Sequence, residues 1–269
     1  MKKIILTLLL MLSNILMSQN LSFVYELRYK PDFTENGLTN KIFILDVLGK
    51  ESVFRSEQER RSDSLKQRTG FGTGQSVIYS DQIYIQKNLI RNHIIKSITT
   101  PFIKEDYFIT ISEPLEWNIV SEKQKIGEYD TQKATVRYGG RNWTAWFTSH
   151  IPIQEGPYIF HGLPGLIVKI SDEKAEYDFN LISTRNSSNT SLFILKKGRE
   201  ITWDNLKKLQ LDYYTDPSAP IKSTGARIKI VDPKGNEIKM DTRNISQNIK
   251  KRIRDQNNSI ELDRLVIYE

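Results

Sequence analysis

Two histidines that flank a turn-rich stretch are the residues in this sequence best suited to metal chemistry. His150 and His161 lie on either side of residues 151–160, so their imidazoles approach each other if that stretch folds back. Glu155 and Asp172 are candidate carboxylate partners, and two imidazoles with one carboxylate form a recurring site for transition metals. The spacing does not match the helical His-Glu-x-x-His zinc motif. A metal-dependent hydrolase that uses these histidines is therefore the alternative hypothesis, and surface or hydrogen-bonded histidines are the favoured interpretation.

Nucleophilic catalysis has less support in the sequence. No serine lies in a Gly-x-Ser-x-Gly elbow, and Ser149 and His150, as neighbours in an extended segment, point to opposite faces. The absence of cysteine excludes a cysteine nucleophile, a zinc–thiolate site and a disulfide. Residues 70–74 are rich in glycine but lack the Gly-Lys-Ser/Thr ending of a phosphate-binding loop. The sequence therefore predicts no catalytic residue and no cofactor.

Large amphipathic side chains between residues 141 and 161 predict a binding surface. Trp146 falls on the polar face of a predicted strand, and Arg141, Tyr158 and His161 lie near it in sequence. Such side chains are typical of recognition surfaces, because they combine apolar area with a polar tip. An equally open interpretation is that a helix or a second sheet covers this face and that Trp146 belongs to the core. These four residues are the candidate binding residues.

The element that must position these side chains is a hairpin over residues 133–147. Gly139 and Gly140 at its centre predict a two-residue turn, because glycine adopts the positive φ that such turns need. Pairing Tyr138 with Arg141 gathers the apolar side chains on one face, and a shift of one residue would scatter them. That face comprises Ala134, Val136, Tyr138, Trp143, Ala145 and Phe147. The register of the hairpin is therefore well specified.

The rest of the chain predicts a fold dominated by strands. It contains 12 Tyr and 11 Phe, and aromatic residues favour strands. Alternating apolar residues from Phe23 to Tyr29 predict an opening strand, residues 56–75 predict a mobile loop, and Thr202 and Thr242 begin two late helices. We expect a β-rich α+β protein with short C-terminal helices. Its antiparallel sheet is expected to curl strongly into a half-barrel or sandwich, with the hairpin and the strand after Gly165 in its middle.

The first eighteen residues predict a secretory signal peptide, 1–18. Lys2 and Lys3 precede an apolar stretch, Ile4 to Leu12, that is too short to span a membrane. Without this signal, residues 19–269 form a single predicted domain, and the net charge falls from +7 to +5. That charge is too small to indicate a nucleic-acid partner. The sequence therefore predicts an exported protein of the periplasm or cell envelope, soluble after cleavage and not membrane-spanning.

One run of residues carries a resemblance to a known family. Residues 162–167 read Gly-Leu-Pro-Gly-Leu-Ile, and they follow Gly140 to Phe147, Ile151-Pro152-Ile153 and Gly156-Pro157-Tyr158. This run, with Trp117-Asn118-Ile119 upstream, resembles the GLPGLI family of exported proteins of Bacteroidota, and the resemblance covers about residues 117–172. Asp130-Thr131 stand where the family often has a cysteine, so any role of that cysteine is absent here.

The resemblance implies a role in the cell envelope, because members are often encoded near TonB-dependent outer-membrane receptors. We therefore expect a non-catalytic binding or accessory module associated with outer-membrane transport or envelope assembly. Its partner is expected to be an outer-membrane receptor or an apolar or peptide ligand. The residues also have a plain structural interpretation, since proline and glycine shape a turn before apolar residues enter the core. The structural motif comprises Gly139, Gly140, Gly162, Leu163, Pro164, Gly165, Leu166 and Ile167.

Overall fold

The fold is described from a computed structural model. The described residues are 20–33, 37–73, 78–187, 198–219, 230–231, 237–238 and 242–269. The predicted signal peptide, 1–18, lies outside them. So does Gly74. The short strands β13 (Ile230–Val231) and β14 (Glu237–Ile238) pair antiparallel in a separate two-stranded sheet.

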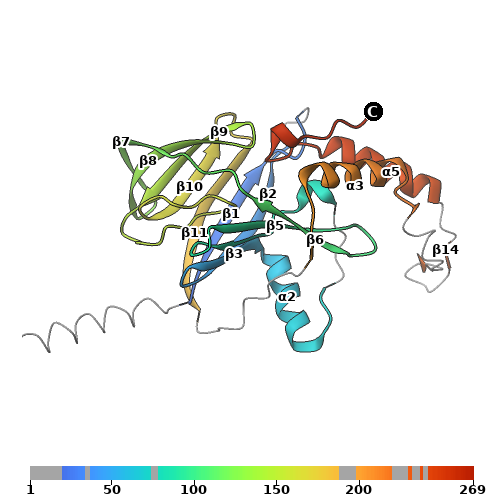
Figure 1. Cartoon of the computed structure of the whole chain (residues 1–269), viewed down its shortest axis with the longest axis horizontal. Coiled ribbons are helices and arrows are strands. Elements are labelled where there is room, and N and C mark those ends of the chain that lie inside the picture. The colour runs from blue at the N-terminus through green and yellow to red at the C-terminus, as the bar shows by residue number, and fades with distance from the viewer. Residues whose placement is uncertain are drawn as a thin grey trace, which may run out of the picture.

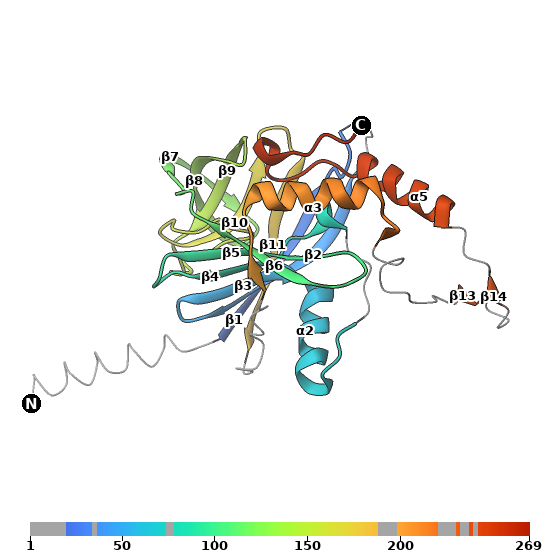
Figure 2. The same cartoon turned by 45° about the vertical axis from the view of Figure 1, so that its right-hand side comes forward.

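Within the described residues, twelve strands form one sheet. Figures 1 and 2 show how it is arranged. Its order is β12-β6-β5-β4-β3-β2-β1-β11-β10-β9-β8-β7. The β12–β6 pairing is parallel, and the other pairings given for the described strands are antiparallel. The strands are β1 (Asn20–Tyr29), β2 (Thr39–Leu48), β3 (Glu51–Ser56), β4 (Ile85–Asn88), β5 (His93–Thr99), β6 (Asp106–Ile111), β7 (Asn118–Ile126), β8 (Tyr129–Tyr138), β9 (Arg141–Thr148), β10 (Leu166–Asp172), β11 (Tyr177–Ser187) and β12 (Arg199–Glu200).

The sheet is open, with β12 and β7 at its edges, and it is not strongly curled. The expectation of a half-barrel or sandwich is therefore wrong, although the chain is rich in strands as predicted. The physical reason is that two irregular segments cover the apolar face. Tyr158, Phe160 and Leu163 from the segment between β9 and β10, and Ile260 near the C-terminus, pack into the core there. The β8–β9 hairpin also lies near the β7 edge, not in the middle.

The β8–β9 hairpin has the predicted register. Tyr138 pairs with Arg141, Val136 with Trp143, and Ala134 with Ala145. The six predicted apolar residues of this face all belong to the core cluster. Gly139 and Gly140 have φ values of 61° and 74°, as a tight two-residue turn requires.

The helices α2, α3 and α5 accompany the sheet. α3 (Trp203–Thr215) is capped by Thr202 as predicted, and it lies beside α5 (Thr242–Asp255) at the end of the sheet opposite α2 (Figure 2). Short 3₁₀ turns form at η2 (Tyr79–Asp81) and η4 (Leu262–Arg264). Within the described residues, no helix has the length and apolar character that crossing a membrane requires.

The helix α2 (Glu57–Thr69) lies where the sequence predicts a loop. Its sequence is almost entirely polar, so it lacks the apolar period by which an amphipathic helix is recognised. Ser56 and Glu59 form a reciprocal capping box at its start, and Gly70 ends it with φ 81°. Local capping therefore defines this helix.

Candidate functional site

A cavity of about 620 Å³ lies beside strands β7, β8 and β9. Most of its lining residues are polar, and the lining comprises Lys123, Gln124, Lys125, Asp130, Thr131, Gln132, Phe147, Ser149, His150 and Pro164. Pro164 belongs to the turn of the GLPGLI segment, so the cavity adjoins the most distinctive part of the sequence.

The cavity lies on the same face of the sheet as the core. Gln132 comes two residues before the core residue Ala134, so both side chains point to one face. Lys123 is opposite Gln132, and Lys125 is opposite Asp130, in the β7–β8 ladder. Residues that are directly opposite share a face, so both lysines lie on the cavity side. The core thus ends near Phe147, and the polar cavity begins there.

The cavity carries unneutralised positive charge. Among the described residues, neither Lys123 nor Lys125 has an ion-pair partner. Lys133, on the opposite face, is instead paired with Glu122 at 2.8 Å. Among the described residues of the lining, Asp130 is the one carboxylate, against two ammonium groups. The local charge therefore favours anionic groups.

The two candidate metal-binding histidines have different surroundings. His150 is exposed and lines the cavity, whereas His161 is half-buried and its Nδ1 lies 2.8 Å from the carbonyl oxygen of Ile159. Burial, and then the nearby ammonium of Lys87, lower the pKa of His161. Within the described part of the chain, no group of three or more His, Asp or Glu residues is arranged to hold a metal ion.

Both candidate carboxylates are bound to buried cations. Glu155 forms an ion pair with the fully buried Lys87 and accepts a hydrogen bond from the Ser52 hydroxyl at 2.7 Å. Burial lowers the pKa of Lys87, while Glu155 opposes that shift. Asp172 forms an ion pair with Arg141 at 2.8 Å. The positions of these carboxylates therefore give the hydrolase hypothesis no support.

Arg141 is buried and anchors the C-terminal segment, 256–269. Its Nη1 lies 2.8 Å from Asp172 and 2.7 Å from Glu176. Its other N–H groups donate to the side chain of Asn258 and to the backbone carbonyls of Ser259 and Ile260. All five guanidinium donors thus bind groups of the chain itself. A role of Arg141 in ligand binding stays a prediction, and the contacts seen here are structural.

Tyr158 and Trp146 are also buried. Tyr158 has a φ of 55° and donates a hydrogen bond to Glu261, so its polar tip is used within the core. Trp146 is 8% exposed and lies outside the core cluster, between Lys133 and Lys169 on the neighbouring strands. The Nζ of Lys133 lies 5.8 Å from the ring centroid. The indole is therefore flanked by lysine side chains on the face opposite the core.

The GLPGLI segment forms a tight turn, and its apolar side chains are buried in the core. Leu163, Leu166 and Ile167 are almost fully buried, while Pro164 is exposed. Gly165 has a φ of 150°, and a Cβ placed on it would lie 2.1 Å from the carbonyl oxygen of Thr148. Only glycine fits so close to this backbone.

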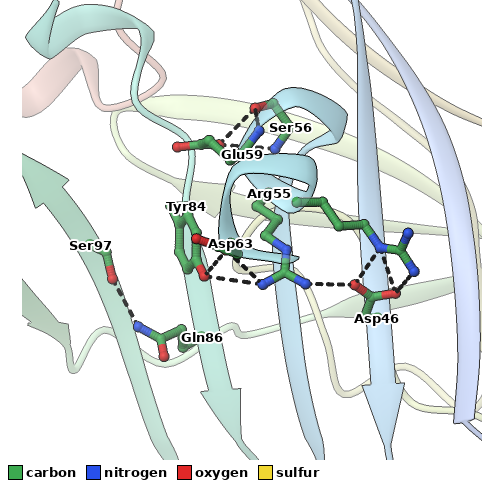
Figure 3. Close-up of polar contacts among 9 residues, drawn as sticks. Asp46, Arg55, Ser56, Glu59, Asp63, Tyr84, Gln86 and Ser97 are labelled. Atoms are coloured by element: carbon green, nitrogen blue, oxygen red, sulfur yellow. Dashed lines mark hydrogen bonds and ion pairs between the residues drawn. The ribbon is translucent and has the colours of Figure 1, made fainter. Parts of the chain in front are cut away.

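Sequence reasoning missed two buried charge clusters. In the first, Arg55 bridges Asp46 and Asp63 at 2.9 Å each, and the Tyr84 hydroxyl donates to Asp63 at 2.7 Å (Figure 3). This cluster attaches α2 to the sheet, and its signal is the single charge of Asp46 within the otherwise apolar run 42–48 of β2. The second cluster joins Glu261 to Lys96, Tyr138 and Tyr158. No local pattern marks Glu261.

The comparisons with known proteins cover part of this architecture. A family model described as "Protein of unknown function (Porph_ging)" matches residues 138–169, from the hairpin turn to β10. The structure of PNGF-II in a C2 space group is similar at 16% identity and a TM-score of 0.49, over 71% of this chain and 32% of that chain. The structure of PNGF-II in a P21 space group is similar at 15% identity and a TM-score of 0.48, over 71% of this chain and 33% of that chain. The chain spans about a third of the length of those chains. No curated protein matches significantly.

Proposed function

We propose that the protein is an exported, non-catalytic binding module of the cell envelope, with the cavity beside β7–β9 as its binding site. The observation that carries this proposal is the presence of two ammonium groups without ion partners, Lys123 and Lys125, around a cavity of about 620 Å³. Ligand sites are typically concave, and polar groups that converge on them fix the orientation of the ligand. Phe147, Ser149, His150 and Pro164 of its lining also fall within the matched segment 138–169.

The charge of the lining favours one of the partners expected from the sequence over another. A receptor segment or a peptide with acidic groups suits a positively charged cavity, whereas an apolar ligand does not. Export to the periplasm or envelope is supported by the predicted signal peptide, and association with TonB-dependent transport is supported by the GLPGLI resemblance.

Site-directed photo-crosslinking in cells that express the full chain tests this proposal. A photoreactive residue at Lys125 is expected to give one discrete adduct in the envelope fraction, identified by mass spectrometry. The matched control carries the same residue at Lys66, an exposed position on α2. Recovery of the protein in the cytoplasm, or equal adducts from both positions, would contradict the proposal.

A further inference from the structure

We propose that the cavity and the edge strand β7 together bind an extended acidic peptide, which joins the sheet as an additional antiparallel strand. This inference rests on the proposed function, because it uses the same cavity, and it specifies the class of partner and the mode of binding.

The edge at β7 is the one long enough for strand addition. In the described sheet β7 pairs with β8 alone and contains nine residues, whereas the opposite edge strand, β12, contains two. A terminal strand presents a row of backbone N–H and C=O groups that an extended peptide can pair with. Most of the side chains of β7 are exposed, so no other part of the described chain covers it.

The hairpin register shows which backbone groups face the open edge. Ile126 and Tyr129 flank a two-residue turn, so they form a hydrogen-bonded pair, and the pair type alternates along the ladder. Gln124 and Thr131 are therefore also a hydrogen-bonded pair, and the Thr131 hydroxyl additionally donates to the Gln124 carbonyl. The backbone groups of Lys123 and Lys125 consequently point away from β8, toward the open edge.

Lys123 and Lys125 thus present two kinds of contact at once. Their backbone groups face the open edge, and their side chains face the cavity on the core side. In an added antiparallel strand, the residues opposite them have side chains on the same face and lie two positions apart. A peptide with acidic residues at alternate positions would therefore place a carboxylate beside each ammonium group.

The charge also decides between an acidic peptide and a second copy of the chain. Lysines on an edge strand oppose the pairing of two identical edges, because like charges would meet. The register shift in β7 between Ile119 and Lys123 further limits pairing to the regular part that follows it. Neither feature opposes an acidic strand, for which the same lysines are attractive.

Binding of synthetic peptides to the mature chain tests the inference. The probe is an eight-residue peptide that alternates Glu with Thr, and its neutral counterpart has Gln for Glu. We expect the Glu peptide to bind roughly tenfold more tightly, because two opposite-charge cross-strand pairs are formed. Replacing Lys123→Glu and Lys125→Glu should reverse the preference toward a peptide that alternates Lys with Thr. Lys50→Glu with Lys66→Glu is the matched control, since both residues are exposed elsewhere and the charge change is the same.

Backbone methylation separates strand addition from simple charge attraction. In the proposed arrangement the N–H groups of the Glu residues face β7 and those of the Thr residues point away. N-methylation at Glu should abolish binding, and N-methylation at Thr should leave it unchanged. Binding that survives methylation at Glu would overturn strand addition while leaving an anion-binding cavity.

If no acidic peptide binds although Lys125 still gives a discrete cellular adduct, the inference is wrong and the proposed function stands. A dimer in analytical ultracentrifugation that is lost in the Lys123→Glu, Lys125→Glu variant would identify a second copy of the chain as the occupant of the edge. That result would also overturn the inference of an acidic peptide.

Discussion

Lys96 and Glu261 form a buried ion pair that joins the sheet to the C-terminal segment. They are 165 positions apart in sequence, and the Nζ of Lys96 lies 2.8 Å from the carboxylate of Glu261. Tyr158 and Tyr138 also donate hydrogen bonds to this carboxylate. Arg141 holds residues 258–260 of the same segment. Charged groups therefore contribute much of the attachment of the C-terminal segment to the sheet.

Loss of the Glu261 charge should destabilise the fold strongly. Glu261→Gln leaves the ammonium of Lys96 buried without a counter-charge, and removal of one partner of a buried pair costs about 3–5 kcal/mol. The control is Glu113→Gln, since the Glu113–Arg264 pair is about half exposed and such pairs contribute about 0–1 kcal/mol. The free energy of unfolding in urea measures both. Equal losses in the two variants would contradict this role of Glu261.

The contribution of Glu261 should also disappear in acid. Burial by itself would raise the pKa of Glu261, but the charge of Lys96 and the hydrogen bonds from Lys96 and Tyr158 outweigh burial and lower it. The unfolded chain therefore binds this proton more readily, so the stabilisation is present above the ordinary glutamate pKa of about 4.3 and is lost as the pH falls through the lower folded-state pKa. The difference in unfolding free energy between the wild type and Glu261→Gln should shrink from pH 7 to pH 3. A difference that stays constant or grows would refute the assignment.

Gly139 should be intolerant of a side chain because the C-terminal segment packs against it. A Cβ at Gly139 would lie 3.1 Å from the Ile260 carbonyl oxygen and from the Glu261 Cα. Gly127 is a matched control, with φ 58° against 61° and no atom within 4 Å of its added Cβ. Both alanine variants share a strain of about 1–2 kcal/mol from positive φ. Gly139→Ala should lose about 1–3 kcal/mol more, from crowding, in the same urea measurement. Equal losses would show that conformation alone requires glycine at position 139.

The sequence predicts parts of the fold whose determinants are local. The β8–β9 register follows from two glycines and one alternating apolar face, and the start of α3 follows from Thr202 as a cap. The shape of the sheet could not be predicted, because it depends on segments from elsewhere in the chain that cover its apolar face. For the same reason Arg141 resembles an exposed recognition residue in sequence, although residues 258–260, more than a hundred positions later, bury it.

The candidate site was only partly visible in the sequence. His150 and Pro164 attract attention through residue type and motif, and both line the cavity. Lys123 and Lys125 lie in a strand so polar that it is indistinguishable from a solvated one. Their importance depends on β7 being an edge strand and on the face to which they point, and both properties follow from pairing across the whole sheet.

Substitution of Gly165, the second glycine of the GLPGLI turn, should show whether this motif serves the structure or the binding of a ligand. A Cβ at Gly165 would lie 2.1 Å from the Thr148 carbonyl oxygen and 2.7 Å from its carbon, and these backbone atoms have little freedom to move. Gly165→Ala should therefore lose about 3 kcal/mol or more of unfolding free energy.

Gly162→Ala is the matched control within the same motif. Gly162 has a φ of 90° and open space around its added Cβ, so its substitution should cost only the strain of about 1–2 kcal/mol. Hydrogen exchange at β9 and β10 gives a second readout if Gly165→Ala unfolds too readily for a urea transition. The opposite result, a Gly165→Ala variant as stable as Gly162→Ala that no longer binds the alternating Glu–Thr peptide, would assign the motif to recognition. A loss of stability with parallel loss of β9–β10 protection would assign the motif to holding Pro164 in place beside the cavity.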